Sequence, residues 1–98
     1  MDEVDIPFVD VIRLKPLDDH KLWLRFSDGC EGVRDLSDIM KLDGPMVAPL
    51  KDPDYFARAF IESGVPTWPN GFDLDAINLY MELRDAKLLT QPSANAAE

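Results

Sequence analysis

The clearest structural signal in the sequence is residues 22–29, which read Leu-Trp-Leu-Arg-Phe-Ser-Asp-Gly. Large apolar side chains occupy every second position, a period of two that is typical of a half-buried strand: Leu22, Leu24 and Phe26. The Asp28-Gly29 pair that follows is typical of a hairpin with a type I′ turn, in which both central residues have positive φ. The sequence therefore predicts that residues 30–36 return as an antiparallel strand.

The segment before this hairpin, residues 8–14, is also rich in apolar residues. These fall on both faces of a regular strand, which indicates either a central strand or one with a bulge that swaps faces partway. Pro16 has no N–H for a ladder, so we expect the strand to end there.

The connection after the hairpin predicts short elements. Ser37 is expected to cap a short helix within residues 36–42, and Asp52-Pro53 gives a second helix start with an acidic cap and proline at the first position. Residues 59–63 and 65–68 are each expected to form a short strand.

The last element is the clearest helix. Asp73 or Asp75 is expected to cap it, and apolar residues recur at helical spacing to form one stripe for the core: Ala76, Leu79, Tyr80, Leu83 and Ala86.

The predicted fold is α+β, with an antiparallel sheet of four or five strands, short helical turns and one C-terminal helix packed on a face. We expect a single domain over residues 1–89 and a flexible tail over 90–98, because the tail is small, polar and interrupted by proline.

Composition and charge exclude several classes of protein. The chain has 98 residues, 10 Lys and Arg, 19 Asp and Glu, and a single cysteine. Its formal net charge of −9 disfavours direct binding to nucleic acid. It has no apolar run long enough for a membrane span, and one cysteine cannot form an internal disulfide. We therefore expect a cytoplasmic protein that contacts neither membrane nor nucleic acid.

An ordered set of short motifs carries a resemblance to a known family. The motifs are Asp28-Gly29, Asp35-Leu36-Ser37, Pro49-Leu50, Asp52-Pro53, Phe56, Trp68-Pro69-Asn70-Gly71, Asp73-Leu74 and Leu79-Tyr80. With them the chain resembles the bacterial proteins grouped as domain of unknown function 2442, over about residues 8–80. The resemblance implies a compact α+β domain with an antiparallel sheet and no established enzymatic activity. It also implies a small protein that stands alone or precedes a helix-turn-helix domain, and that is often encoded beside another small protein, as in toxin–antitoxin pairs. Pro66 departs from the pattern, because the family usually has an apolar strand residue there.

Residues that carry chemistry are sparse. His20 follows two aspartates, but a proline on one side and a strand on the other make this an ordinary solvated turn. Cys30 has no partner cysteine and no cation before Arg34, so nothing marks it as an activated thiolate. The acidic clusters lack the spacing of a calcium loop. We expect no catalytic residue, no metal site and no cofactor.

Five residues are candidates for binding a partner protein: Trp23, Trp68, Ile77, Met81 and Leu88. The last three form a second apolar stripe on the predicted C-terminal helix, where we expect an interface. Trp23 projects opposite the apolar face of its strand, which indicates either a wider core or an exposed patch. Trp68 either anchors a partner beside a fixed turn or packs under the helix; turn chemistry explains every residue type of its motif and favours packing.

These observations predict a non-enzymatic protein-interaction module. We expect it to bind another small protein, a basic one in view of its own charge, or a second copy of itself. The family resemblance adds the antitoxin-like half of a two-protein pair. The alternatives are a dimerisation or ligand-sensing domain of a transcription-regulatory assembly, and a small enzyme whose active site would bring His20 and carboxylates together.

Overall fold

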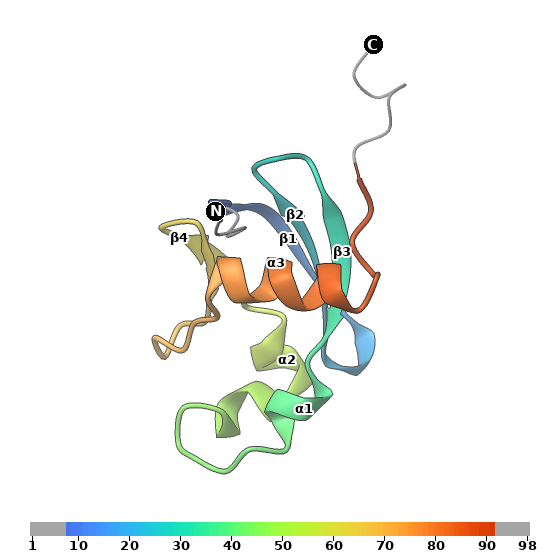
Figure 1. Ribbon diagram of the computed structural model, residues 1–98. Coiled ribbons are helices and arrows are strands. Elements are labelled where there is room, and N and C mark those ends of the chain that lie inside the picture. Colours follow the sequence, from blue (N-terminus) through green and yellow to red (C-terminus); the bar gives the residue numbers. More distant parts are fainter. Residues whose placement is uncertain (1–7, 92–98) are drawn as a thin grey trace.

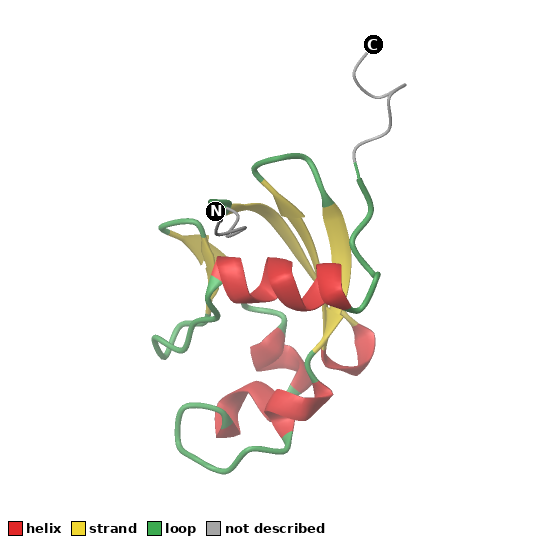
Figure 2. Cartoon of the chain, viewed as in Figure 1, coloured by secondary structure: helices red, strands yellow, loops and turns green. Residues whose placement is uncertain are grey.

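The structure is a computed structural model that describes residues 8–91 (Figure 1). In chain order its elements are β1 (Val11–Leu17), a 3₁₀ turn (Asp18–His20), β2 (Lys21–Phe26), β3 (Glu31–Asp35), α1 (Ser37–Met40), a second 3₁₀ turn (Ala48–Lys51), α2 (Pro53–Phe56), β4 (Phe60–Glu62), β5 (Val65–Thr67) and α3 (Ala76–Asp85). Helix α3 crosses one face of the larger sheet, and the short helices gather at one end of the molecule (Figure 2). The α+β class and the C-terminal helix are as predicted.

The strands divide between two antiparallel sheets. One has the order β1-β2-β3, and the other is the hairpin β4-β5. The prediction of one sheet with four or five strands is therefore wrong. Strand β4 lies beside β1, but the only backbone hydrogen bond between β1 and the second hairpin runs from Val11 N–H to the Gly64 carbonyl (2.8 Å) within the described residues.

The first hairpin forms where the sequence predicts it, with a different turn. Phe26 N–H donates to the Cys30 carbonyl (2.8 Å) and Gly29 N–H to the Phe26 carbonyl (2.9 Å). Only Gly29 of the Asp-Gly pair has positive φ (92°). The loop is thus three residues long, a turn followed by a left-handed glycine, rather than a two-residue type I′ turn.

Strand β1 contains the predicted bulge, because its register with β2 shifts between Val11 and Arg13. It does not end at Pro16, which lies opposite Leu22 and is followed by Leu17 in the ladder. A proline is tolerated here because β1 is an edge strand and position 16 faces away from β2.

The helix starts follow the predictions in two of three places. Asp52 caps α2 by accepting from Asp54 N–H (3.1 Å), and Asp75 caps α3 by accepting from Asn78 N–H (2.9 Å). Ser37 does not cap α1: it is the first helical residue, and its N–H donates to the Asp35 carboxylate (2.9 Å).

Helix α3 presents its buried residues to the inner face of the larger sheet, where the core lies. Ala76, Leu79, Tyr80 and Leu83 are buried as predicted, whereas Ala86 follows the helix end and is exposed. At position 32 of β3 a Cβ would meet Leu83 Cδ1 and the Leu88 carbonyl at 3.0 Å, so Gly32 lets the end of α3 approach the sheet.

The chain stays folded past the predicted domain boundary. Thr90 was expected to begin a flexible tail, but its N–H and carbonyl exchange hydrogen bonds with Glu31 at the edge of β3 (2.7 and 3.0 Å). The remaining part of the predicted tail, residues 92–98, lies outside the described residues.

Candidate partner-binding surface

On the outer face of the β1-β2-β3 sheet, opposite α3, every residue that the structure describes is exposed or half-buried. Trp23 lies at its centre, paired across the ladders with Lys15 on one side and Val33 on the other. Along β2 the residues alternate between buried and half-buried, which separates the core face from this outer face. Trp23 is half-buried, so its ring packs against neighbours and still presents surface to solvent.

This outer face is richer in cations than the chain as a whole. Arg13, Lys15, Lys21 and Arg25 all occupy outer-face positions of the register. The guanidinium of Arg25 lies 5.8 Å from the Trp23 ring centroid and donates to Glu31 (Nε to Oε2, 2.8 Å). A cationic surface around an aromatic ring therefore forms on a protein whose net charge is −9.

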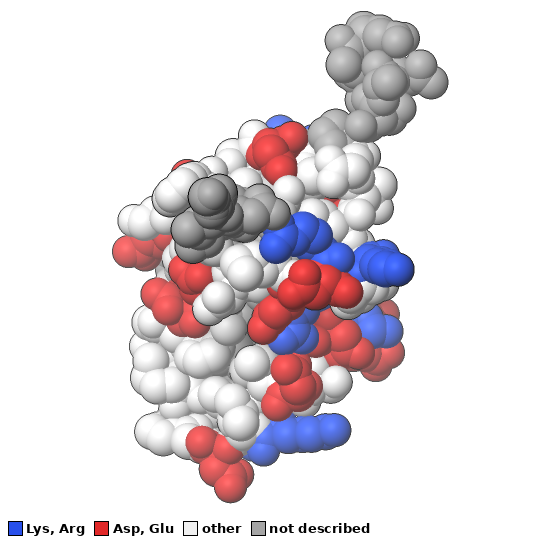
Figure 3. Space-filling view, in the orientation of Figure 1, with Lys and Arg blue, Asp and Glu red and all other residues white. Residues whose placement is uncertain are grey.

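The opposite side of the molecule has mixed charge. Figure 3 shows carboxylates and cations interspersed over the C-terminal half of α3. There Arg34 donates to Glu82 (3.0 Å) and to Asp38 (3.1 Å), and these hydrogen bonds raise the pKa of Arg34. The charged side chains of this region pair with one another, whereas Arg13 and Lys15 on the outer face form no ion pair within residues 8–91.

Two hollows lie end to end along β1. One is lined by residues 12–15 and 59–61 together with Trp23, and the other by residues 16–20 and by residues of the segment 53–57. One wall is thus β1 with the turn that follows it, and the other is the chain from α2 to β4. We call the two hollows together the β1 groove.

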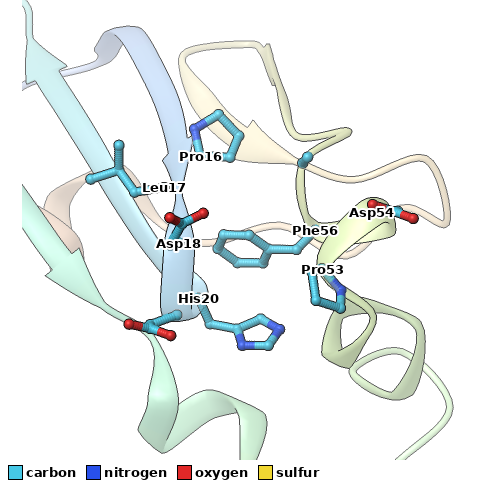
Figure 4. Close-up of a pocket in the computed structure, with 9 residues that line it drawn as sticks. Pro16, Leu17, Asp18, His20, Pro53, Asp54 and Phe56 are labelled. Carbon is cyan, nitrogen blue, oxygen red and sulfur yellow. The ribbon is translucent and has the colours of Figure 1, made fainter.

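Figure 4 shows the second half of this groove, with Pro16, Asp18 and His20 facing α2 across it. His20 packs edge-on against Phe56 (5.1 Å between centroids), and its Nε2 lies 3.0 Å from the Lys51 carbonyl. Because a carbonyl only accepts, Nε2 carries the proton in this contact. Asp19 and His20 both have positive φ (62° and 56°), so the turn is held in a conformation that non-glycine residues rarely adopt.

Trp68 is fully buried, as the packing interpretation of its motif predicts, so its side chain is not exposed for contact with a partner. Its Nε1–H donates to the Phe56 carbonyl (2.9 Å), and the turn behind it closes from Gly71 N–H to the Trp68 carbonyl (2.8 Å). Within the motif Gly71 has positive φ (91°) and Asn70 does not. Asn70 instead donates to the Met46 carbonyl (2.9 Å), so the Trp-Pro-Asn-Gly segment fixes a turn and fills the core.

The predicted stripe on α3 is not continuous. Ile77 and Met81 are half-buried on the helix, but Leu88 lies beyond its end and is 56% exposed. Leu88 lines a third hollow with Trp23 and Val33, on the β3 side of the outer face. The structure thus brings Leu88 together with Trp23, and not with the other members of the stripe.

Sequence reasoning missed the β1 groove. Ile12 and Phe60, both exposed, contribute to it from strands that are far apart in sequence. The local signal was the pair Arg13 and Lys15, alternating with apolar residues in β1. Their proximity to β4 depends on the tertiary fold, which a single-sequence pattern does not show.

A partly buried polar cluster ties the hairpin turn to α3. Asp28 accepts from the hydroxyl of Tyr80 (2.7 Å) and from the N–H and thiol of Cys30 (3.0 and 3.4 Å). Burial raises the pKa of Asp28, but these hydrogen bonds together outweigh it and lower the pKa. The hydrogen bond to Asp28, followed by burial, raises the pKa of Tyr80, and burial above all raises the pKa of Cys30. The thiol is therefore held in its unreactive protonated form.

Two further features bear on the class of protein. Within residues 8–91, no three His, Cys, Asp or Glu side chains are grouped so as to hold a metal ion. Over the same residues, no helix has the length and apolar character that crossing a membrane requires.

Fold and surface together define a small α+β domain with two antiparallel sheets and a C-terminal helix. Residues 11–85 match the family described as Protein of unknown function (DUF2442). Because the match covers more than half of the chain, the protein belongs to this family. No curated protein and no solved structure is significantly similar to it.

Proposed function

We propose that the protein is a non-enzymatic interaction module that binds another small protein through the outer face of its β1-β2-β3 sheet. The observation that carries this proposal is the face around Trp23, where apolar side chains are exposed at both margins. Val33 and Leu88 flank Trp23 on the β3 side, and Ile12 and Phe60 lie on the β1 side. Exposed apolar patches with a central half-buried aromatic are typical of protein–protein contacts.

The reactive groups favour binding over catalysis. The Cys30 thiol is buried and its pKa is raised, so it supplies no thiolate near neutral pH. His20 uses Nε2 in a contact with a backbone carbonyl, and among residues 8–91 no serine, cysteine or threonine lines the hollow beside it. Nucleophilic catalysis requires a nucleophile within hydrogen-bond reach of a base, and this hollow does not bring such a pair together among the described residues.

The partner expected from the family resemblance is another small protein, with this chain as the antitoxin-like half of the pair. The net charge of −9 attracts a basic partner at long range, because opposite net charges accelerate the encounter of two proteins. The patch of that partner that contacts the cationic face around Trp23 is expected to carry acidic side chains.

The test is capture of partners from the lysate of the source cell on the tagged full-length chain, with the complex weighed by light scattering. Val33→Asp places a charge on the outer face, and Leu42→Asp makes the same change at an exposed position in the loop after α1. We expect one stoichiometric partner, with capture reduced by Val33→Asp by about tenfold or more and unchanged by Leu42→Asp. Recovery of the protein alone as a monomer, or equal loss with both variants, would contradict the proposal; recovery as a homodimer would replace the heterologous partner by a second copy.

A further inference from the structure

We propose that the β1 groove binds an extended segment of a partner protein, which adds as a strand to the open edge of β1. The segment carries acidic side chains beside Arg13 and Lys15 and basic side chains beside Asp18, Asp19 and Asp54. This inference rests on the proposed function and adds to it the conformation and the charge pattern of the bound segment.

Strand β4 lies beside this edge of β1 without forming a ladder with it, so the edge is open in the sense that its backbone groups are unpaired. This follows from the hydrogen-bond alternation of the sheet. The pair Phe26 and Cys30 is hydrogen-bonded, so the even residues of β2 face β3 and the odd residues face β1. Arg13, Lys15 and Leu17 therefore direct their backbone groups to β2.

Leu14, between them, directs its N–H and carbonyl to the open edge. Within the described residues, no backbone hydrogen bond joins residues 12–17 to any strand other than β2. Pro16 offers a carbonyl without an N–H, which limits the added strand to the stretch before and at Pro16. An unpaired edge of this kind is the template for strand addition.

The groove supplies side-chain contacts along this edge. Ile12 and Phe60 are 49% and 41% exposed and face it from its two walls, near Trp23. The other half has Pro16, Leu17 and Pro53 in its lining. Successive side chains of a bound strand point alternately, so every second residue of the segment meets this apolar lining.

The charges of the groove are separated along its length. Arg13 and Lys15 line the half next to Trp23, and neither takes part in an ion pair within residues 8–91. Asp18, Asp19 and Asp54 line the other half. A segment with the opposite order of charges meets complementary groups at both ends, whereas a uniformly charged segment is repelled at one end.

A protein segment fits these observations better than a nucleic acid strand. A phosphate backbone is negative throughout, so the half of the groove with three aspartates repels it. The neighbouring Trp23 ring does offer a stacking surface, which makes single-stranded nucleic acid a direct competitor in the test.

The experiment uses synthetic eight-residue peptides with valine at alternate positions and the full-length chain. One peptide has lysines in its first half and glutamates in its second, one has the reverse order, and two have uniform lysine or uniform glutamate. We expect one of the two polarised peptides to bind about tenfold more tightly than either uniform peptide. We also expect the Leu14 amide to exchange with solvent at least about tenfold more slowly in that complex, while the Lys15 amide, already bonded to β2, is unchanged.

Matched variants separate local contact from long-range attraction. Arg13→Glu with Lys15→Glu reverses the charge of one half of the groove, and Lys41→Glu with Lys87→Glu changes the net charge equally at exposed positions outside the groove. We expect the first pair to abolish the preference for the polarised peptide and the second to leave it. N-methylation of the peptide on its bonding edge should abolish binding altogether.

Several outcomes would overturn the inference. These are no binding at millimolar peptide, an unchanged Leu14 amide, equal effects of the two variant pairs, or tighter binding of an eight-nucleotide oligothymidylate. Concentration-dependent protection of Leu14 in the protein alone would assign the edge to a second copy. If lysate capture still depends on Val33 while the peptides fail, the proposed function stands and only the strand addition is lost.

Discussion

Among single residues, Asp28 stands in the hairpin turn and also forms hydrogen bonds that link this turn to α3. Its carboxylate joins the loop after β2 to Tyr80 on α3, and the same carboxylate holds the N–H of Cys30 at the start of the returning chain. A hydrogen bond to an ionised group is stronger than a neutral one. The aspartate of the Asp-Gly pair is therefore fixed by this network, and the glycine by its backbone conformation.

Replacing this carboxylate should change the response to acid. The pKa of Asp28 is lower in the folded state, so its stabilising contribution is complete above its unfolded pKa of about 4 and is lost as the pH falls through the folded value. We expect Asp28→Asn to lower the free energy of unfolding at pH 7 by about 1 kcal/mol, since the group is partly solvated. The difference from the unmodified protein should shrink as the pH falls below about 4. Urea unfolding at a series of pH values measures this, with Asp43→Asn as the control for removing one exposed carboxylate.

The two tryptophans differ in what their removal should cost. Trp68→Phe leaves the Phe56 carbonyl without its donor and opens a cavity in the core, so we expect a loss of about 2–4 kcal/mol. Trp23→Phe removes half-buried surface only and should cost less than about 1 kcal/mol. Urea unfolding followed by circular dichroism compares the two, and equal losses would contradict the assignment of Trp68 to the core and Trp23 to the surface.

At the scale of elements, α3 ends in a tight hydrogen-bonded motif. Leu88 N–H donates to the Leu83 carbonyl (2.9 Å) and Lys87 N–H to the Arg84 carbonyl (3.0 Å), the pattern of a Schellman motif. Lys87 has a φ of 61°, a conformation that glycine adopts without strain. This end directs the chain back to β3, where Thr90 pairs with Glu31.

The strain at Lys87 predicts a stabilising substitution. Lys87→Gly should raise the free energy of unfolding by about 0.5–1 kcal/mol, because it relieves the left-handed conformation. Lys87→Ala removes the same charge and keeps the strain, so it should not stabilise the protein. Thermal unfolding of the two variants decides the point; a Lys87→Gly protein no more stable than Lys87→Ala would contradict it.

Elements set by local chemistry could be predicted from the sequence. The period of two in β2, the proline after Asp52 and the cap at Asp75 each act within a few residues, and each element forms as expected. The division into two sheets could not be predicted in this way, because it depends on which edge β4 meets. The outward position of Leu88 could not be predicted either, because the prediction assumed that the helix continues to residue 88, whereas it ends at Asp85.

At the scale of the whole molecule, charge is the dominant property. The net charge of −9 is spread over a small domain, and few ion pairs offset it within residues 8–91. The sequence predicts the sign of the net charge and hence the charge of a partner at long range. It does not predict that the face around Trp23 is locally cationic, because strand pairing brings Arg13, Lys15 and Arg25 together.

Repulsion among the excess carboxylates predicts that thermal stability depends on salt concentration. Raising sodium chloride from about 0.05 to 0.5 M shortens the Debye length to a few ångström and screens the excess carboxylates, so the midpoint of thermal unfolding should rise by roughly 2–4 °C. Asp18→Asn with Asp54→Asn removes two negative charges from the net charge of −9 and should reduce this rise. A midpoint that falls with salt would show that the ion pairs of Arg25 and Arg34 outweigh the repulsion.

The opposite placements of Trp23 and Trp68 also give the protein two intrinsic optical probes. The indole of Trp68 is fully buried and hydrogen-bonded, so it should emit at shorter wavelength and be shielded from a soluble quencher. The indole of Trp23 is partly exposed, so a quencher can reach it. The fraction of fluorescence that acrylamide quenches should therefore come from Trp23. A partner that covers the outer face would remove that fraction and leave the emission of Trp68 unchanged, so occupancy and unfolding can be followed separately in one unlabelled sample.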